Sequence, residues 1–201
     1  MLYIDIETIP DGEPLPLESF EANKTTKDEE KIKQQKINKQ QSEFRSRALH
    51  PLKGKIVCIA FAFYNEKIEV VYGDDEEKLI RHFIKSISNF NDNIYPMVGH
   101  NIKAFDWPFI NARLMKYGIK NTFIKEHSHL FDTIRLTADF SYRTMYSLKD
   151  LATFLGYDAK QDMEGSEVYD YWKEGEHEKV AEYCVQDVET LRLIHSRYLG
   201  L

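Results

Sequence analysis

Hydrophobic and polar residues alternate at the start of the chain. In residues 2–7 (LYIDIE), a strand would place the leucine and both isoleucines on one face and Asp5 and Glu7 on the other. The turn-forming residues 10–12 (PDG) then predict the end of this strand. The pattern therefore predicts an N-terminal strand that carries two carboxylates on a single face.

The rest of the hydrophobic pattern changes between strand-like and helix-like segments. We expect a strand at 55–64 that forms a hairpin with 67–73, because both are rich in β-branched and aromatic residues. Further strands are predicted at 94–98 and 129–136, and helices at 74–90, 105–117, 147–156 and 178–198. These elements predict one α/β domain over residues 1–201, with a mixed five-stranded sheet flanked by helices.

A charged insertion separates the first two predicted strands, at about residues 13–50. Its middle, residues 24–41, consists mainly of Lys, Glu, Gln and Asn, and only Ile32 and Ile37 are large and apolar. Such a segment cannot form a core of its own, so we expect a solvated helical arm or a mobile loop. Its lysines leave two further interpretations open, a clamp for an anionic substrate or an arm that binds a partner.

The composition excludes several classes of protein. Of the 201 residues, 42 % are hydrophobic and 30 % are charged, which excludes a disordered or fibrous chain. No apolar run approaches the roughly 18 residues that span a bilayer, and the N-terminal residues lack the pattern of a signal peptide. Cys58 and Cys184 lie in separate apolar stretches, so we expect neither disulfides nor a cysteine-based metal site. We therefore expect a cytoplasmic protein with no membrane partner.

The net charge of −6 argues at first against a nucleic-acid partner, because basic patches are the usual electrostatic footprint of such proteins. This argument weakens if carboxylates of the chain bind metal. Two bound divalent cations would bring the net charge from −6 to −2 and would reverse the local field at the site. The charge therefore does not decide the partner.

Asp5 and Glu7 differ in their context from other acidic pairs of the same spacing in the chain. Isoleucines interleave them in a strand expected to be buried, where an uncompensated carboxylate is costly. Asp106 follows a predicted strand end, which is where open α/β sheets place their sites, although an Asp there could also cap the next helix. Asn101 and His100 lie on the same turn, and we expect His100 to be structural.

Tyr183 and Asp187 are four residues apart in the longest predicted helix and therefore project from one helix face, toward the sheet. We expect Asp187 to join Asp5, Glu7 and Asp106 in one cluster, with no cysteine and few histidines nearby in sequence. An all-oxygen ligand set favours Mg²⁺ or Mn²⁺ over zinc, and clustered carboxylates need cations to remain ionised. Two ions about 4 Å apart can hold the attacking and leaving oxygens of a phosphoryl transfer, which predicts phosphodiester hydrolysis.

Three segments together resemble the motifs of the DEDDy 3′–5′ exonucleases, especially stand-alone relatives of the proofreading domain of family-B DNA polymerases. They are Asp5-Ile-Glu7-Thr8, Asn101-x-x-x-Phe105-Asp106 and Tyr183-x-x-x-Asp187, and the likeness extends to residues 147–151 and 163–166. The resemblance implies a ribonuclease H-like fold. It implies two Mg²⁺ or Mn²⁺ ions held by Asp5, Glu7, Asp106 and Asp187. It also implies a grip on the 3′-terminal nucleotide by Thr8, Ile9, Asn101 and Phe105.

The activity that this resemblance implies is hydrolysis of the terminal phosphodiester of single-stranded DNA, with release of nucleoside 5′-monophosphates. Tyr183 has an ordinary pKa near 10 and would orient the attacking water rather than deprotonate it. RNA is the second candidate substrate, because discrimination depends on a few contacts with the 2′-OH. A catalytically silent module that binds nucleic acid or protein is a third hypothesis, and no oligomeric state is indicated.

One match to the related DEDDh class also occurs, from His127 to Asp132. It falls in a predicted strand and not on the last helix, so we assign it no catalytic role. We expect Asp132 and Thr133 to end a strand or cap a helix.

Overall fold

A computed structural model describes residues 1–90, 94–120, 129–136, 145–157 and 163–201. The described residues form a five-stranded sheet in the order β3-β2-β1-β4-β5. The strands are β1 (Leu2–Pro10), β2 (Gly54–Phe63), β3 (Glu69–Tyr72), β4 (Met97–Gly99) and β5 (Leu130–Asp132). β1 is antiparallel to β2, and β2 to β3, whereas β4 and β5 run parallel to β1. The predicted hairpin and the mixed sheet are therefore confirmed.

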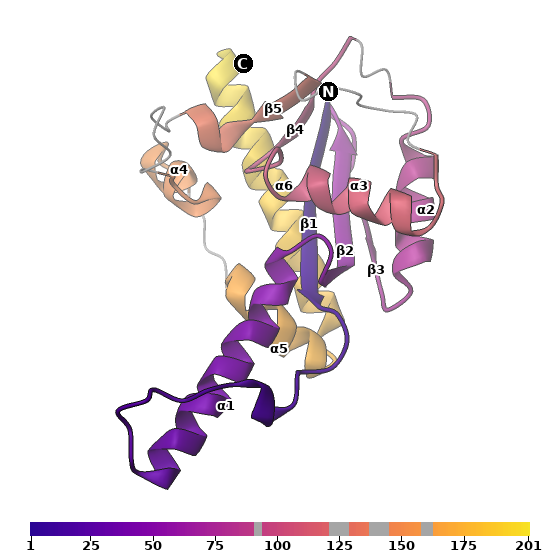
Figure 1. Cartoon of the computed structure of the whole chain (residues 1–201). Helices are drawn as coiled ribbons and strands as arrows, with labels where there is room; N and C mark the ends of the chain where they lie inside the picture. Colours follow the sequence, from indigo (N-terminus) through magenta and orange to yellow (C-terminus); the bar gives the residue numbers. More distant parts are fainter. Residues whose placement is uncertain (91–93, 121–128, 137–144, 158–162) are drawn as a thin grey trace.

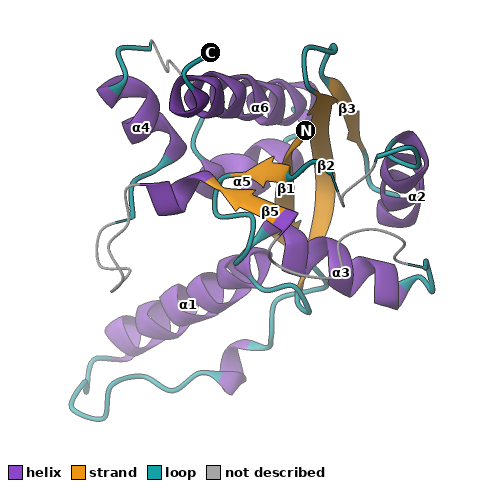
Figure 2. Ribbon diagram, turned by 90° about the horizontal axis from the view of Figure 1, so that it is seen from above, coloured by secondary structure: helices purple, strands orange, loops and turns teal. Residues whose placement is uncertain are grey.

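Helices cover both faces of this sheet (Figure 1, Figure 2). Helices α2 and α3 pack on one face, and α4, α5 and α6 pack on the other. The helices are α1 (Glu29–Ser46), α2 (Glu76–Ser86), α3 (Asp106–Lys116), α4 (Leu148–Phe154), α5 (Val168–Lys173) and α6 (His177–Leu199). Within the described ranges, no helix is both long and apolar enough to cross a membrane.

β1 lies in the centre of the sheet and separates two hydrophobic clusters. Ile4 and Ile6 pack with the residues of α2 and α3, while Tyr3 packs with those of α4, α5 and α6. The predicted alternation along this strand is thus confirmed. Because side chains two apart share a face, Asp5 and Glu7 project toward the face that α6 covers.

The insertion between β1 and β2 forms the expected charged helical arm. The carboxylate of Asp28 caps α1 by accepting hydrogen bonds from the backbone amides of Glu30 and Lys31, at 3.0 and 3.1 Å. The helix projects away from the sheet, and its C-terminal end is fastened to α5 (Figure 1). There the ring of Phe44 meets that of Tyr169 edge-on, and Arg45 donates two hydrogen bonds to Asp170, at 2.9 and 2.6 Å.

The structure corrects three expectations about the elements. The strand expected at 94–98 begins only after Pro96, which has no amide hydrogen to donate to a sheet. The strand expected at 129–136 ends at Asp132, because residues 133–136 turn into a 3₁₀ helix. Helix α5 has no counterpart among the predicted helices, because its six residues span fewer than two turns and show no helical period.

A buried ion pair joins α2, α3 and β2 on the face away from the two acids of β1. Glu76 and Arg113 are each 4 % exposed, and the Nε of Arg113 lies 2.8 Å from Oε1 of Glu76. Glu76 also accepts hydrogen bonds from the amide of Ile56 and the hydroxyl of Tyr117, both at 2.6 Å. These contacts fix the two helices against the sheet.

We expect Glu76→Ala to lower the free energy of unfolding by about 3–5 kcal/mol, because it leaves the Arg113 guanidinium buried without its carboxylate. Urea unfolding followed by circular dichroism measures this loss. The control is Glu77→Ala, which removes the neighbouring exposed acid that pairs with Arg81 and should cost about 0.5 kcal/mol or less. Equal stability of the two variants would contradict a structural role for the buried pair.

Candidate active site

The first two acids of the site come from the middle of β1. Carboxylate oxygens of Asp5 and Glu7 and the sulfur of Cys184 all lie within 4.8 Å of one another. β4 pairs with β1 only at Leu2 and Tyr3, so it ends before the strand reaches Asp5. The edge of β1 beside the two acids is thus left for the segment that follows β4.

That segment places Asp106 against β1. β4 ends at Gly99, and Asn101 adopts a positive φ of 61°, which turns the chain back before α3 begins at Asp106. A Cβ on Gly99 would lie 2.6 Å from the Cβ of Ile102, so only glycine permits this close turn. Asp106 is 2 % exposed, and its carboxylate interacts with the backbone of Ile6. The third acid therefore reaches the strand that carries the first two.

Asp132, at the end of β5, fixes the turn that positions Asp106. Its carboxylate accepts hydrogen bonds from the amides of Asn101 at 2.8 Å and Lys103 at 3.2 Å, and from that of Ile134 at 3.3 Å. This is the strand-ending and capping role expected for Asp132. His127, the other half of the DEDDh-like match, lies outside the described residues.

Helix α6 contributes the remaining acid and the tyrosine. Asp187 is 8 % exposed, and it accepts a hydrogen bond from the hydroxyl of Tyr183, one turn earlier on the same helix. Cys184 lies between them in sequence, and its sulfur is 3.4 Å from Oδ2 of Asp5. The four acids and Tyr183 thus converge from β1, the start of α3 and α6, as the sequence predicts.

Burial and neighbouring charges oppose the ionisation of three of the acids, Asp5, Glu7 and Asp106. Burial is the largest cause that raises the pKa of Asp5 and of Glu7, and the neighbouring acids raise it further. The pKa of Asp106 is raised to about 7 by burial, with Asp132 and Asp187 adding to the rise. Burial, followed by the charge of Asp187, raises the pKa of Tyr183 well above its ordinary value, so its hydroxyl keeps its proton.

A cavity of about 340 Å³ opens onto the acids. Asp5, Tyr183 and Asp187 line it on one side, and His100, the start of α4 and residues 164–165 line it on the other. The ring of His100 is held at both nitrogens, by the hydroxyl of Thr133 and the carbonyl of Tyr146, each at 3.0 Å. Burial lowers the pKa of His100. Its structural role agrees with the expectation from sequence, although it also faces the cavity.

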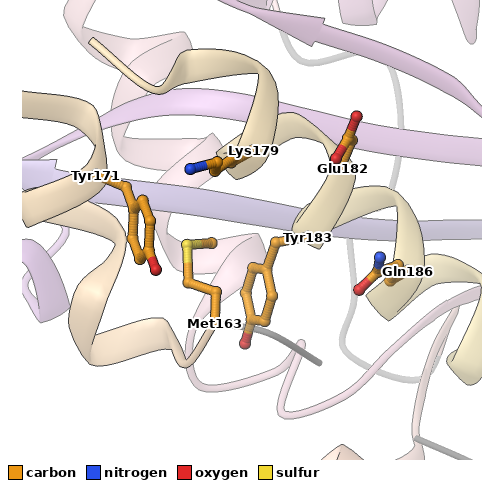
Figure 3. A pocket seen from close by; sticks show the side chains of 6 residues that line it. All are labelled: Met163, Tyr171, Lys179, Glu182, Tyr183 and Gln186. Carbon is orange, nitrogen blue, oxygen red and sulfur yellow. The ribbon is translucent and has the colours of Figure 1, made fainter. Parts of the chain in front are cut away.

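Tyr183 is also part of the wall of a neighbouring cavity of about 300 Å³ (Figure 3). Its ring lies beside Met163, and Tyr171 stands on the far side of the methionine. Lys179 lines this cavity as well, but it forms an ion pair with Glu176 at 3.2 Å. The phenol ring of Tyr183 therefore separates two cavities, and the acids open onto only one of them.

The structure places the four residues expected to bind substrate in different environments. Thr8 is buried, and its hydroxyl donates a hydrogen bond to the carbonyl of Ala48 at 2.6 Å. Ile9 is buried in the hydrophobic cluster beneath α6, and Phe105 is half-buried against Phe109. Asn101 is half-exposed on the turn before α3. All four adjoin the acidic cluster in sequence, but Thr8 and Ile9 direct their side chains into contacts within the protein.

The expectation that no cysteine lies near the acids is wrong. Cys184 directly follows Tyr183 and is three residues from Asp187, so helical periodicity alone places it on the same face. Its thiol donates to Asp5, and burial raises its pKa, which keeps the thiol neutral. Lys149, at the start of α4, is a second residue at the cavity that sequence reasoning did not select.

The donor set fits hard divalent cations. The neighbours that raise the pKa values of Asp5 and Glu7 are carboxyls and thiols, so these acids lie in a strongly electronegative pocket. Carboxylate oxygens are the ligands that Mg²⁺ and Mn²⁺ prefer, and a bound cation would offset the cost of burying several like charges. The cluster can therefore hold metal, and Cys184, as a neutral thiol, is a weak competitor for it.

Comparison with known proteins identifies the family. Residues 42–200 match the family model described as a predicted 3′–5′ exonuclease related to the exonuclease domain of PolB. The chain belongs to this family. The matched segment includes Asp106, Tyr183 and Asp187, whereas Asp5 and Glu7 precede it and join the site through the fold.

Two larger proteins are similar to this PolB-exonuclease-related chain. A DNA polymerase of Archaeoglobus fulgidus is 29 % identical over 169 residues, which cover 75 % of this chain and 21 % of the polymerase. The family B DNA polymerase of Pyrobaculum calidifontis has a similar fold, with a TM-score of 0.64 and 18 % identity over 99 % of this chain and 24 % of that one. The chain thus spans about a fifth to a quarter of these relatives, and a ribonuclease H-like fold is consistent with the likeness.

The raised carboxyl pKa values predict how the metal-free protein responds to pH. A carboxyl whose pKa is higher when folded than when unfolded binds its proton more tightly in the folded state, so stability falls as pH rises through the folded value. For Asp106 the fall extends from its unfolded pKa of about 4 to about 7. We expect the melting temperature in EDTA to decrease over this interval.

Differential scanning calorimetry in EDTA and in 10 mM Mg²⁺ measures the effect. Bound cations should flatten the decrease, and Asp106→Asn, which cannot ionise, should show a shallower decrease in EDTA than the unsubstituted chain. A melting temperature in EDTA that does not change between pH 5 and 8 would show that the acids do not repel one another.

Proposed function

We propose that this chain is a 3′–5′ exonuclease that hydrolyses the terminal phosphodiester of single-stranded DNA and releases nucleoside 5′-monophosphates. The observation that carries the proposal is that Asp5, Asp187 and a protonated Tyr183 line one open cavity, with the buried acids Glu7 and Asp106 close to Asp5. Membership of a family of predicted 3′–5′ exonucleases supports the same reaction.

Asp5, Glu7, Asp106 and Asp187 would hold two Mg²⁺ or Mn²⁺ ions in this site. When bound, such ions act as Lewis acids on water and phosphate. The protein's own contribution is to keep the four oxygen ligands close together and partly shielded from solvent. In the reaction, the oxygen of a water molecule joins the phosphorus of the terminal nucleotide, and the 3′-oxygen of the preceding nucleotide leaves and takes up a proton.

Tyr183 orients the attacking water. Because its pKa is raised and its hydroxyl remains protonated, it can donate and accept hydrogen bonds but cannot serve as a general base near neutral pH. His100 is another titratable group that lines the cavity, but both its nitrogens are already held by the protein. Its ring therefore shapes the cavity, and Lys149 supplies a positive charge on the same wall for the substrate phosphates.

RNA remains the second candidate substrate, and a silent binding module the third hypothesis. DNA is favoured because the two similar proteins described above are DNA polymerases. A silent module would have no need to keep Asp5 and Glu7 in a pocket where burial and the charges of Asp106 and Asp187 raise their pKa values. Thr8, Ile9, Asn101 and Phe105 are proposed to border the terminal nucleotide, with Thr8 and Ile9 acting through backbone atoms.

Asp5→Asn should abolish hydrolysis while the fold is retained, because a neutral amide replaces an anionic carboxylate that is proposed to bind metal. The assay follows shortening of 5′-labelled single-stranded DNA and RNA of one sequence, with Mg²⁺, with Mn²⁺ and with EDTA. We expect stepwise loss of 3′ nucleotides from DNA in either metal, slower loss from RNA, and none in EDTA.

The matched control is Asp11→Asn, an exposed acid just beyond β1 that should leave the rate within about twofold. Shortening that persists in EDTA, or that survives Asp5→Asn, would contradict a metal site at these acids. A folded protein that shortens neither substrate would favour the silent module.

Tyr183→Phe should lower kcat by about 10²-fold with a small change in KM, as expected when one positioning or proton-transfer group is lost. Tyr171→Phe is the control, because Tyr171 lines the other cavity and lies across Met163 from Tyr183 (Figure 3). Steady-state kinetics on the preferred oligonucleotide compare the two variants. An unchanged kcat for Tyr183→Phe would remove this residue from the mechanism.

A further inference from the structure

Neither the backbone conformation nor the packing of the described residues requires a glycine at position 165. Six of the nine glycines have positive φ values that favour glycine, and a Cβ on Gly54 or Gly99 would lie within 2.7 Å of a neighbouring atom. Gly165 has neither property. Its φ lies outside the left-handed region, and among the described residues the nearest atom to an added Cβ is the hydroxyl oxygen of Tyr183, at an ordinary contact distance of 3.9 Å. The described part of the chain would therefore accept a side chain here.

Gly165 also lies where two cavities meet. It lines the cavity of Asp5, Tyr183 and Asp187, and it lines a second cavity of about 580 Å³ between the C-terminal end of the arm and α5. Thr8, which follows Glu7 on β1, belongs to the wall of this second cavity. The cavity of Figure 3 shares Tyr183 with the acidic site but is not lined by Gly165, so it gives no reason for a glycine. A ligand that extends from the acids into the second cavity would cross Gly165.

The walls of the second cavity are fixed by contacts between distant segments. The guanidinium of Arg45 donates two hydrogen bonds to Asp170 and lies over the ring of Tyr169, 5.6 Å from its centroid. On the β1 side, Thr8 is bonded to Ala48, which lies in the short 3₁₀ helix η2 (Arg47–Leu49) after the arm. The cavity therefore has a defined shape, built jointly by the insertion and by the region around Gly165.

The chemistry of this cavity suits a nucleoside better than a phosphate. Arg45 and Asp170 are paired with each other, so the guanidinium is not available as a strong phosphate ligand. Tyr169 and Leu49 provide an aromatic ring and an exposed aliphatic side chain, and Ser166 provides a small polar group. A volume of about 580 Å³ lies within the range of roughly 300–1,000 Å³ that is usual for small-molecule sites. Bases of single strands bind such surfaces by stacking and apolar contact.

We propose that the nucleoside on the 5′ side of the scissile phosphate occupies the cavity between the arm and α5, and that the strand reaches it by passing over Gly165. This subsite rests on the proposed exonuclease function. It assigns a role to the insertion, whose C-terminal end and η2 form one wall. It also gives a role to Gly165 and Ser166, two of the residues 163–166 to which the family resemblance extends.

The first test is Gly165→Ala. The variant should melt at the same temperature as the unsubstituted chain or higher, because the added methyl group meets no atom of the described residues closer than 3.9 Å. It should lower kcat/KM for the tetranucleotide (dT)₄ at least tenfold relative to kcat/KM for the p-nitrophenyl ester of thymidine 5′-monophosphate. That ester presents the terminal nucleotide but carries no nucleoside on the 5′ side.

The second test compares two exposed leucines of one loop. Leu49 lines the cavity and Leu52 does not; their exposed fractions are 70 % and 74 %. Leu49→Ala should lower the same ratio about fivefold, chiefly through KM for (dT)₄, and Leu52→Ala should leave the ratio within twofold. Neither leucine is buried, so neither variant is expected to disturb the fold.

The outcomes separate this inference from the proposed function. Hydrolysis of both substrates by the unsubstituted chain, with an unchanged ratio in Gly165→Ala and Leu49→Ala, overturns the subsite and leaves the exonuclease intact. Hydrolysis of neither substrate overturns the exonuclease and the subsite with it. A drop in the melting temperature of Gly165→Ala of more than about 5 °C would reveal a structural need for glycine and overturn the argument made from it.

Discussion

The main constraint on this structure is the electrostatic repulsion between carboxylates held in a partly buried pocket, which the contacts around the pocket must overcome. Burial, together with the charges of neighbouring acids that include Asp187, raises the pKa values of Asp5, Glu7 and Asp106 and opposes folding in the absence of a compensating cation. The fold offsets this by anchoring each acid on a rigid element whose position is determined elsewhere. β1 is held by neighbours on both sides, α6 by the hydrophobic cluster beneath it, and the start of α3 by the carboxylate of Asp132. Such a pocket is rigid because the supporting contacts lie outside it, and it presents a concentrated negative charge that attracts hard cations.

Much of this arrangement can be predicted from local patterns. Alternation along residues 2–7 places two acids on one face, and the four-residue spacing of Tyr183 and Asp187 places them on one side of a helix. What local patterns miss is set by contacts between distant segments. Helix α5 is too short to show a period, and β4 and β5 are short because the turns after them are fixed by Asp132 and a 3₁₀ helix. Cys184 could have been placed beside the acids by the same helical spacing, but its position in an apolar stripe indicated only a core residue.

The insertion shows how a segment without a core of its own comes to form the wall of a cavity. Its outer part, rich in lysine and glutamine, lies before the residues that match the family model. Its inner end is instead attached to α5. The ring of Phe44 contacts that of Tyr169, and Arg45 forms an ion pair with Asp170 through two hydrogen bonds. The attached segments form the walls of a cavity that Gly165 also lines. Gly165 belongs as well to the wall of the cavity that Asp5 and Asp187 line. The hydrophobic pattern of the arm gives no sign of this, because the cavity exists only once α5 and the arm meet.

The central claim is that the four acids form one site for paired divalent cations. Crystals grown with Mn²⁺ and measured near the manganese absorption edge test it most directly, because anomalous scattering locates the ions independently of the protein. The account predicts two peaks about 4 Å apart, each within roughly 2–2.6 Å of carboxylate oxygens of the cluster. Absence of both peaks at saturating Mn²⁺, or ions bound only elsewhere on the chain, would contradict it.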